Sequence, residues 1–110
     1  MKAPEQGDIV LLDFDPQAGH EQAGHRPGLV VSESEFNQVT GFIFVVPVTN
    51  QIKNYPFEVP IRGTKKTKGV ALADQMKSLD AKARRCKVMD RVNQATLNRA
   101  LDLITVIMGR

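Results

Sequence analysis

The stretch FIFVVPV, residues 42–48, is the strongest signal for secondary structure in this sequence. Its β-branched and aromatic side chains suit the pleated surface of a β-strand better than the surface of a helix. Pro47 has no backbone N–H, so we expect the strand to lie at a sheet edge or to break its hydrogen-bond ladder there. This stretch predicts a β-rich fold, and shorter apolar runs on both sides of it extend the pattern.

Two short apolar runs precede this strand. Residues 9–12 (IVLL) predict a strand buried on both faces, and residues 29–31 (LVV) predict a second strand. The polar stretch 34–39 predicts one or two helical turns, with Ser32 or Ser34 as the N-cap.

Further short strands are expected after residue 48. Between residues 57 and 61, apolar Phe57, Val59 and Ile61 alternate with Glu58 and Pro60, which predicts a strand with one solvent-facing side. Other strands are predicted around residues 70–73, 75–79 and 86–89.

The end of the sequence predicts a clear helix. Asn93 is a suitable N-cap, and Gly109 is a suitable stop. Apolar residues recur at helical spacing between these two positions: Leu97, Ala100, Leu101, Ile104 and Ile107. Many short strands with one amphipathic helix predict a mainly β fold, a small and strongly bent antiparallel barrel with the C-terminal helix packed against it.

Length and composition restrict the possible functions. A chain of 110 residues, 42% hydrophobic and 25% charged, predicts one domain over residues 1–110 with a buried core. The single cysteine, Cys86, excludes a disulfide framework, fits a reducing cytoplasm, and is expected to be a small apolar filler rather than a nucleophile. The sequence has neither a signal-peptide core nor the ~20 consecutive apolar residues of a membrane-spanning helix. Its two histidines and one cysteine have no zinc-ligand spacing, so we expect no metal and no cofactor.

Basic residues are slightly in excess and are clustered. The net charge of +3 permits a polyanionic partner without requiring one. The segment RGTKKTKG, residues 62–69, includes Lys65 and Lys66 and suits contact with a nucleic-acid backbone, although solubility alone also explains it. Tyr55, just before this segment, is a candidate for stacking on a base. A second basic cluster has the same two explanations and comprises Lys82, Arg84, Arg85 and Lys87.

The connection between the first two predicted strands is longer than a hairpin requires. Residues 15–27 (DPQAGHEQAGHRP) exceed the about 2–5 residues of a tight hairpin loop, and long loops on a rigid scaffold often carry function. Cleaving RNA through its 2′-hydroxyl needs a base, an acid and positive charge beside the phosphate. Arg26 can supply the charge, and Glu21, His20 or His25 can transfer protons. An ordinary solvated loop is the alternative.

A second candidate for chemistry is Thr49, where the strand 42–48 runs into a polar turn. Its hydroxyl can donate to an oxyanion, or it can satisfy the backbone of its own turn.

These residues together resemble the MazF/PemK family of toxins, and the terminal helix also corresponds. The matching elements occur in the family's order: residues 7–10 (GDIV), 13–16 (DFDP), 19–27 (GHEQAGHRP), 47–49 (PVT), 55–59 (YPFEV) and 69–75 (GVALADQ). The resemblance implies an SH3-like barrel that acts as a homodimer. It implies a sequence-specific endoribonuclease that cleaves single-stranded mRNA without a metal, leaving a 2′,3′-cyclic phosphate and a 5′-hydroxyl. It also implies a partner, an antitoxin whose flexible acidic tail lies over the basic groove.

The resemblance also implies roles for individual residues. The family's catalytic arginine and threonine match Arg26 and Thr49, and a family glutamate near the active loop matches Glu21. We expect Arg26 to stabilise the phosphorane charge and pass a proton to the leaving oxygen, and Thr49 to hold a phosphate oxygen. Glu21 and Arg26 itself are both candidates for the general base that removes the 2′-proton. The remaining residues expected to bind RNA are His20, Gln22, His25, Tyr55, Lys65, Lys66, Asp74 and Gln75.

Two other functions stay open at this point. A toxin of the same fold can act on a protein such as DNA gyrase, and a barrel of this fold can bind RNA or peptide without cleaving it. The pairing of Arg26 with Thr49 favours the nuclease, because a protein-binding toxin has no need of it.

Overall fold

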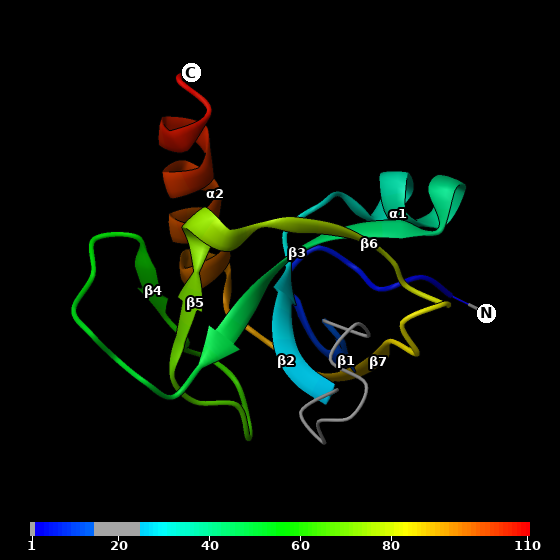
Figure 1. Ribbon diagram of the computed structural model, residues 1–110, viewed down its shortest axis with the longest axis horizontal. Coiled ribbons are helices and arrows are strands. Elements are labelled where there is room, and N and C mark those ends of the chain that lie inside the picture. Colours follow the sequence, from blue (N-terminus) through cyan, green and yellow to red (C-terminus); the bar gives the residue numbers. More distant parts are fainter. Residues whose placement is uncertain (1, 15–24) are drawn as a thin grey trace.

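The computed structural model describes residues 2–14 and 25–110 (Figure 1). Within these residues, seven β-strands and two α-helices follow one another along the chain, with a 3₁₀ turn before the sixth strand. The elements are β1 (Asp8–Asp13), β2 (His25–Val30), α1 (Ser34–Thr40), β3 (Phe42–Thr49), β4 (Glu58–Pro60), β5 (Val70–Leu72), η2 (Ala73–Gln75), β6 (Lys77–Asp80), β7 (Lys87–Arg91) and α2 (Gln94–Ile107).

The strands form one antiparallel sheet in the order β4-β5-β3-β2-β1-β7, and β6 also pairs with β3. The sheet bends into a barrel-like shape. It does not close, because β7 and β4, at the two ends of the order, do not pair among the described strands. The helix α2 contacts β4 and η2, whereas α1 contacts β3. The predicted mainly β fold with a packed C-terminal helix is confirmed.

Pro47 lies where one edge of β3 changes partner. β6 pairs with β3 as far as Val45, and β5 begins to pair at Val48. On the opposite edge, Pro47 faces Gly28 of β2. The predicted break in the ladder is therefore confirmed, while the alternative of an edge strand is wrong, because β3 has neighbours on both sides.

Both faces of the sheet carry a buried cluster. Successive residues of a strand point to opposite faces, so β1 contributes Ile9 to one cluster and Val10 to the other. The cluster with Ile9 continues into α2 through Leu97 and Ala100. The expectation that the first strand is buried on both faces is confirmed.

The start of α2 agrees with the sequence prediction, and its last turn differs. The side-chain oxygen of Asn93 accepts the Thr96 backbone N–H at 2.9 Å, which is the expected cap. Ile107, predicted to face the core, is 43% exposed because it lies in the last turn, beyond the buried positions of the helix. Gly109 follows with a φ of 80°, the left-handed geometry that commonly ends a helix.

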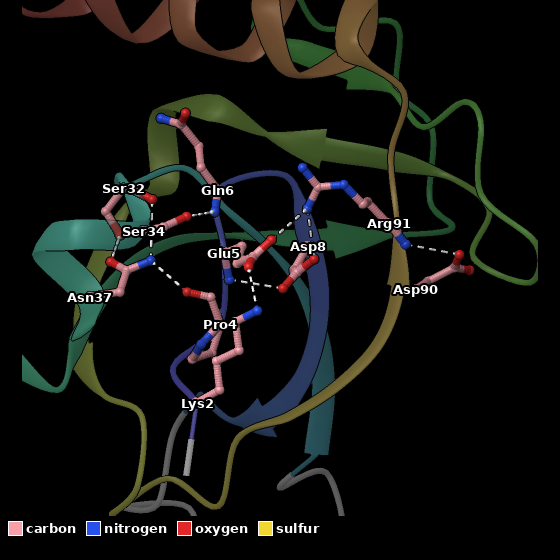
Figure 2. Close-up of polar contacts among 10 residues, drawn as sticks. All are labelled: Lys2, Pro4, Glu5, Gln6, Asp8, Ser32, Ser34, Asn37, Asp90 and Arg91. Carbon is pink, nitrogen blue, oxygen red and sulfur yellow. Dashed lines mark hydrogen bonds and ion pairs between the residues drawn. The ribbon is translucent and has the colours of Figure 1, made fainter.

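The cap predicted for α1 is wrong. Glu33 occupies the N-cap position, and its side chain makes no capping bond. The Ser32 hydroxyl instead donates to the side-chain oxygen of Asn37 (Figure 2) and accepts the Phe44 N–H, so it joins the helix to β3.

Several strand boundaries also differ from the prediction. β2 begins at His25 rather than at residue 29, and the strand predicted over residues 57–61 is only Glu58–Pro60. Glu58, expected to face solvent, is buried at 9% exposure because it binds the backbone of the preceding loop.

Neither described helix is long and apolar enough to cross a membrane.

Candidate active site

An open hollow of about 650 Å³ lies where β2 begins and β3 ends. Its walls come from these two strand ends, the loop of residues 50–57, β4, β5 and the η2 turn. Five residues expected from the sequence to bind or cleave RNA line it: Arg26, Thr49, Tyr55, Asp74 and Gln75.

The pairing of β2 with β3 explains why Arg26 and Thr49 both lie in the wall of this hollow. The ladder between the strands ends at Gly28 opposite Pro47. Arg26 and Thr49 each lie two residues beyond that pair, so their side chains belong to the same face of the sheet. Figure 1 shows the two strands diverging toward these ends. The divergence opens the hollow and leaves both side chains in its wall.

The position of Thr49 is fixed by its turn and by β5. Its hydroxyl oxygen accepts the Gln51 N–H at 3.1 Å, as expected for a residue that satisfies its own turn. This contact leaves the hydroxyl proton available for a ligand. Gly69, with a φ of 111°, packs against the Thr49 carbonyl so closely that a Cβ atom there would collide with it.

Tyr55 and Asp74 form a polar contact across the hollow. The phenol O–H donates to a carboxylate oxygen of Asp74 at 2.9 Å. This hydrogen bond and the negative charge of Asp74 raise the pKa of Tyr55 above its ordinary value. Tyr55 is 46% exposed, and its ring packs against that of Phe57 with centroids 5.8 Å apart. An exposed ring in this position suits stacking on a base.

Glu58 is a site residue that the sequence analysis missed. Its buried carboxylate accepts the N–H groups of Lys53 and Tyr55, at 3.0 and 3.3 Å, and so holds the loop of residues 50–57. The alternation of apolar and polar residues along this strand predicted that the Glu58 side chain faces solvent. One signal in the sequence could have predicted the role of Glu58: it comes directly after a loop whose backbone N–H groups need hydrogen-bond acceptors.

Three of the predicted RNA-binding residues lie outside this hollow. His25 sits opposite Asp13 on β1, and its Nδ1 lies 3.3 Å from the Asp13 carboxylate. The N–H groups of Lys65 and Lys66 donate to Asp90 of β7, at 2.9 and 2.8 Å. Among the described residues that line the hollow, none of these three is present.

Asp90 fixes the basic segment 62–69. Desolvation by itself raises the pKa of Asp90, but four backbone N–H donors outweigh it and hold that pKa well below its ordinary value. The donors are Lys65, Lys66, Thr67 and Arg91.

Three predicted residues, His20, Glu21 and Gln22, lie outside the described residues. At the end of β1, Arg84 donates from its guanidinium to the carbonyls of Asp13 and Phe14 at 3.1 and 3.0 Å. It therefore anchors the end of β1.

Cys86 has the properties of a filler. Burial, and then the charge of Asp8, raise the pKa of its thiol to about 11, which disfavours the reactive thiolate. In the part of the chain that the structure describes, no three His, Cys, Asp or Glu side chains gather as a metal site would require.

A bent antiparallel sheet with a C-terminal helix, and an arginine and a threonine that line one hollow at its strand ends, are the features that the sequence led us to expect of a small barrel-like toxin. The family model described as PemK-like, MazF-like toxin of type II toxin-antitoxin system matches residues 5–108. This chain belongs to the MazF/PemK family of endoribonuclease toxins.

Similar proteins include one of curated function and two solved structures. The endoribonuclease toxin MazF of Escherichia coli strain K12 is 44% identical over 106 residues, which cover 96% of this chain and 95% of that protein. A crystal structure of MazF from Deinococcus radiodurans, 39% identical, superposes with a TM-score of 0.88 and full coverage of both chains (100% each). A chain in a MazE-MazF crystal structure from the same organism, 33% identical, has a TM-score of 0.86 with 99% and 98% coverage. The predicted family, enzyme class and fold are confirmed.

Proposed function

We propose that the hollow between Arg26 and Thr49 binds single-stranded mRNA and cleaves it at specific sequences, without a metal ion or other cofactor. Cleavage of mRNA in the cytoplasm stops translation and growth. The observation that supports this most strongly is that two side chains 23 positions apart in the sequence, the arginine and threonine of the family motif, line one hollow.

The proposed reaction is a transesterification within the RNA. The 2′-oxygen attacks the adjacent phosphorus and loses its proton to a base, and the bond to the 5′-oxygen breaks. The leaving oxygen takes up a proton, so the products are a 2′,3′-cyclic phosphate and a 5′-hydroxyl. The nucleophile belongs to the substrate, so the protein has to supply charge, proton transfer and positioning.

Arg26 carries the largest share of this work. Free guanidinium stays protonated up to pH 12 or so, and its parallel N–H donors match the non-bridging phosphate oxygens. It therefore stabilises the charge that develops on the phosphorane, and it passes a proton to the leaving oxygen. Thr49 holds one phosphate oxygen with the hydroxyl proton that its turn leaves unused. The candidates for the base are Glu21 and Arg26. To act as the base, Arg26 has first to lose a proton to solvent, and it then passes to the leaving oxygen the proton that it takes from the 2′-oxygen.

The other walls of the hollow bind the RNA. Tyr55 stacks on a base, and Asp74 and Gln75 accept and donate hydrogen bonds at base edges. We assign His20 and Gln22 to the same strand of RNA. His25, Lys65 and Lys66, which do not line the hollow, contact phosphates of nucleotides farther from the cut.

The proposal includes two protein partners. The end of α2 exposes Val106, Ile107 and Met108 at 64%, 43% and 64%, which favours a second copy of the chain against this surface. The similarity to a chain of a MazE-MazF crystal structure supports a cognate antitoxin. We propose that its flexible acidic tail lies over the cations of the hollow, Arg26 and Lys53, and competes with RNA for them.

A single assay separates this function from the two alternatives. The purified chain is incubated with a labelled single-stranded RNA in EDTA, and with the same RNA carrying deoxyribose at the mapped cut site. We expect cleavage of the first and none of the second, because deoxyribose lacks the attacking hydroxyl. Binding without cleavage would identify a silent RNA-binding barrel, and neither binding nor cleavage would favour a toxin that acts on a protein.

A further inference from the structure

A second hollow, of about 490 Å³, lies on another part of the surface and shares no described residue with the first. It lies between the N-terminal segment, the end of α1 and the turn that joins β6 to β7. Figure 1 shows the N-terminal segment and this turn, coloured yellow, next to each other. Its apolar floor includes Pro4, Ala81 and Cys86, and the half-exposed Val88 lies at its edge.

The rim of this hollow is basic. It carries Lys2, Lys82, Arg85 and Lys87, and none of the described residues that line it is acidic. Lys2 and Arg85 have carboxylate partners, at 3.1 and 3.6 Å, but both cations are mostly exposed, so these ion pairs are weak. Within residues 2–14 and 25–110, no ion pair involves Lys82 or Lys87. The rim therefore favours an anionic ligand.

The walls are held in place without a ligand. The Asn37 side-chain amide donates to the Pro4 carbonyl at 2.9 Å and ties the N-terminal segment to α1 (Figure 2). The Ala81 N–H donates to the Gly41 carbonyl at 3.1 Å, and the Cys86 N–H donates to the Ala81 carbonyl at 2.9 Å. A preformed hollow avoids part of the ordering cost of binding.

The chemistry of the floor distinguishes between two kinds of anionic ligand. Sequence-tolerant binding of single-stranded RNA relies on aromatic side chains that stack on bases, and no described residue of this hollow is aromatic. An apolar floor beneath a cationic rim instead complements a peptide that combines an aliphatic side chain with flanking carboxylates.

We propose that this hollow is the docking site for an acidic segment of a partner protein. An aliphatic side chain of that segment occupies the floor, and its carboxylates face Lys82 and Lys87. The site is separate from the hollow of Arg26 and Thr49, so a partner can dock here whether or not that hollow holds RNA, and the proposal does not depend on RNA cleavage.

The test uses the full chain, labelled with ¹⁵N, and a blocked peptide of sequence DLEDLED as the probe. We expect the amide signals of Gly41, Ala81 and Lys87 to shift on titration, and those of Asn98 and Thr105, which lie on α2 outside both hollows, to stay in place. The peptide DSEDSED keeps the charge but lacks the aliphatic side chains, and KLKKLKK reverses the charge; both are expected to bind at least about tenfold more weakly.

Two further measurements test the rim and the floor. The double variant Lys82→Glu/Lys87→Glu should weaken binding of DLEDLED at least about tenfold, while Lys68→Glu/Arg99→Glu, the same change of charge elsewhere, should change it less than about twofold. Cys86 is the only cysteine of the chain, so slower alkylation of its thiol in the presence of the peptide reports directly that the floor is covered.

Several results would overturn the proposal. These are shifts confined to the first hollow, equal binding of DSEDSED, and unchanged binding by Lys82→Glu/Lys87→Glu. Saturable shifts of Ala81 and Lys87 with a single-stranded oligoribonucleotide would assign the hollow to RNA. Protection of Cys86 that grows with protein concentration alone would assign it to a second copy of the chain.

Discussion

Replacing Glu58 by glutamine should loosen the loop of residues 50–57 while leaving the sheet intact. The carboxylate accepts two N–H groups, from Lys53 at 3.0 Å and from Tyr55 at 3.3 Å. Hydrogen bonds to a charged group contribute about 1.5–3 kcal/mol each, and the longer of these two contributes less. A glutamine keeps one acceptor oxygen and turns an NH₂ toward the other donor. We therefore expect a local loss of about 2 kcal/mol.

Hydrogen exchange of individual amides measures this loss where it occurs. A loss of about 2 kcal/mol corresponds to roughly thirtyfold faster exchange of the Lys53 and Tyr55 amides, with core amides such as Val45 unchanged. The exposed residue Glu35 provides the matched control, Glu35→Gln, which should change none of these rates. RNA cleavage by Glu58→Gln should show a raised KM and a nearly unchanged kcat, because Arg26 and Thr49 stay in place. Unchanged exchange at both amides would refute the assigned role of Glu58.

Three other predictions concern Gly69, Asp90 and Cys86. Gly69→Ala forces a side chain into a left-handed backbone position against the Thr49 carbonyl; we expect a loss of roughly 2 kcal/mol or more by urea unfolding, together with slower cleavage. The pKa of Asp90 is lowered in the folded protein, so the stabilisation by its carboxylate is complete above the ordinary pKa of 3.8 and is lost as the pH falls below 3.8. The variant Asp90→Asn should therefore flatten the acid side of a stability–pH curve measured by thermal unfolding. The raised pKa of Cys86, about 11, predicts that alkylation stays slow at pH 7.5 and speeds up about tenfold for each pH unit toward pH 10; a plateau near pH 8.5 would contradict it.

The features that could be predicted from the sequence are those decided by local chemistry. The strand around residues 42–48 follows from its β-branched side chains, and the break in its ladder follows from the missing N–H of Pro47. The start of α2 follows from the capping side chain of Asn93. Each of these depends on a few neighbouring residues, so a pattern in the sequence is sufficient to find it.

Features that depend on pairing between distant strands could not be predicted from a local pattern in the sequence. Alternation assigned Glu58 to solvent, because the pattern assumes a regular strand and cannot include the loop N–H groups that draw the carboxylate inward. The sequence predicted that His25 and Arg26 lie in one loop and act at one site, but β2 already begins at His25, so the two side chains point to opposite faces. The motif alone predicted that Arg26 and Thr49 act together; the strand register gives the reason why they line the same hollow.

The central claim is that Arg26 and Thr49 act together on one phosphodiester. The most direct measurement is the single-turnover cleavage rate of a labelled single-stranded RNA by Arg26→Ala, Thr49→Val and the control Arg99→Ala, with RNA affinity measured on the same samples. We predict that Arg26→Ala slows cleavage by at least about a hundredfold with RNA still bound, that Thr49→Val slows it less, and that Arg99→Ala matches the parent protein. Cleavage by Arg26→Ala at the parental rate would contradict the account.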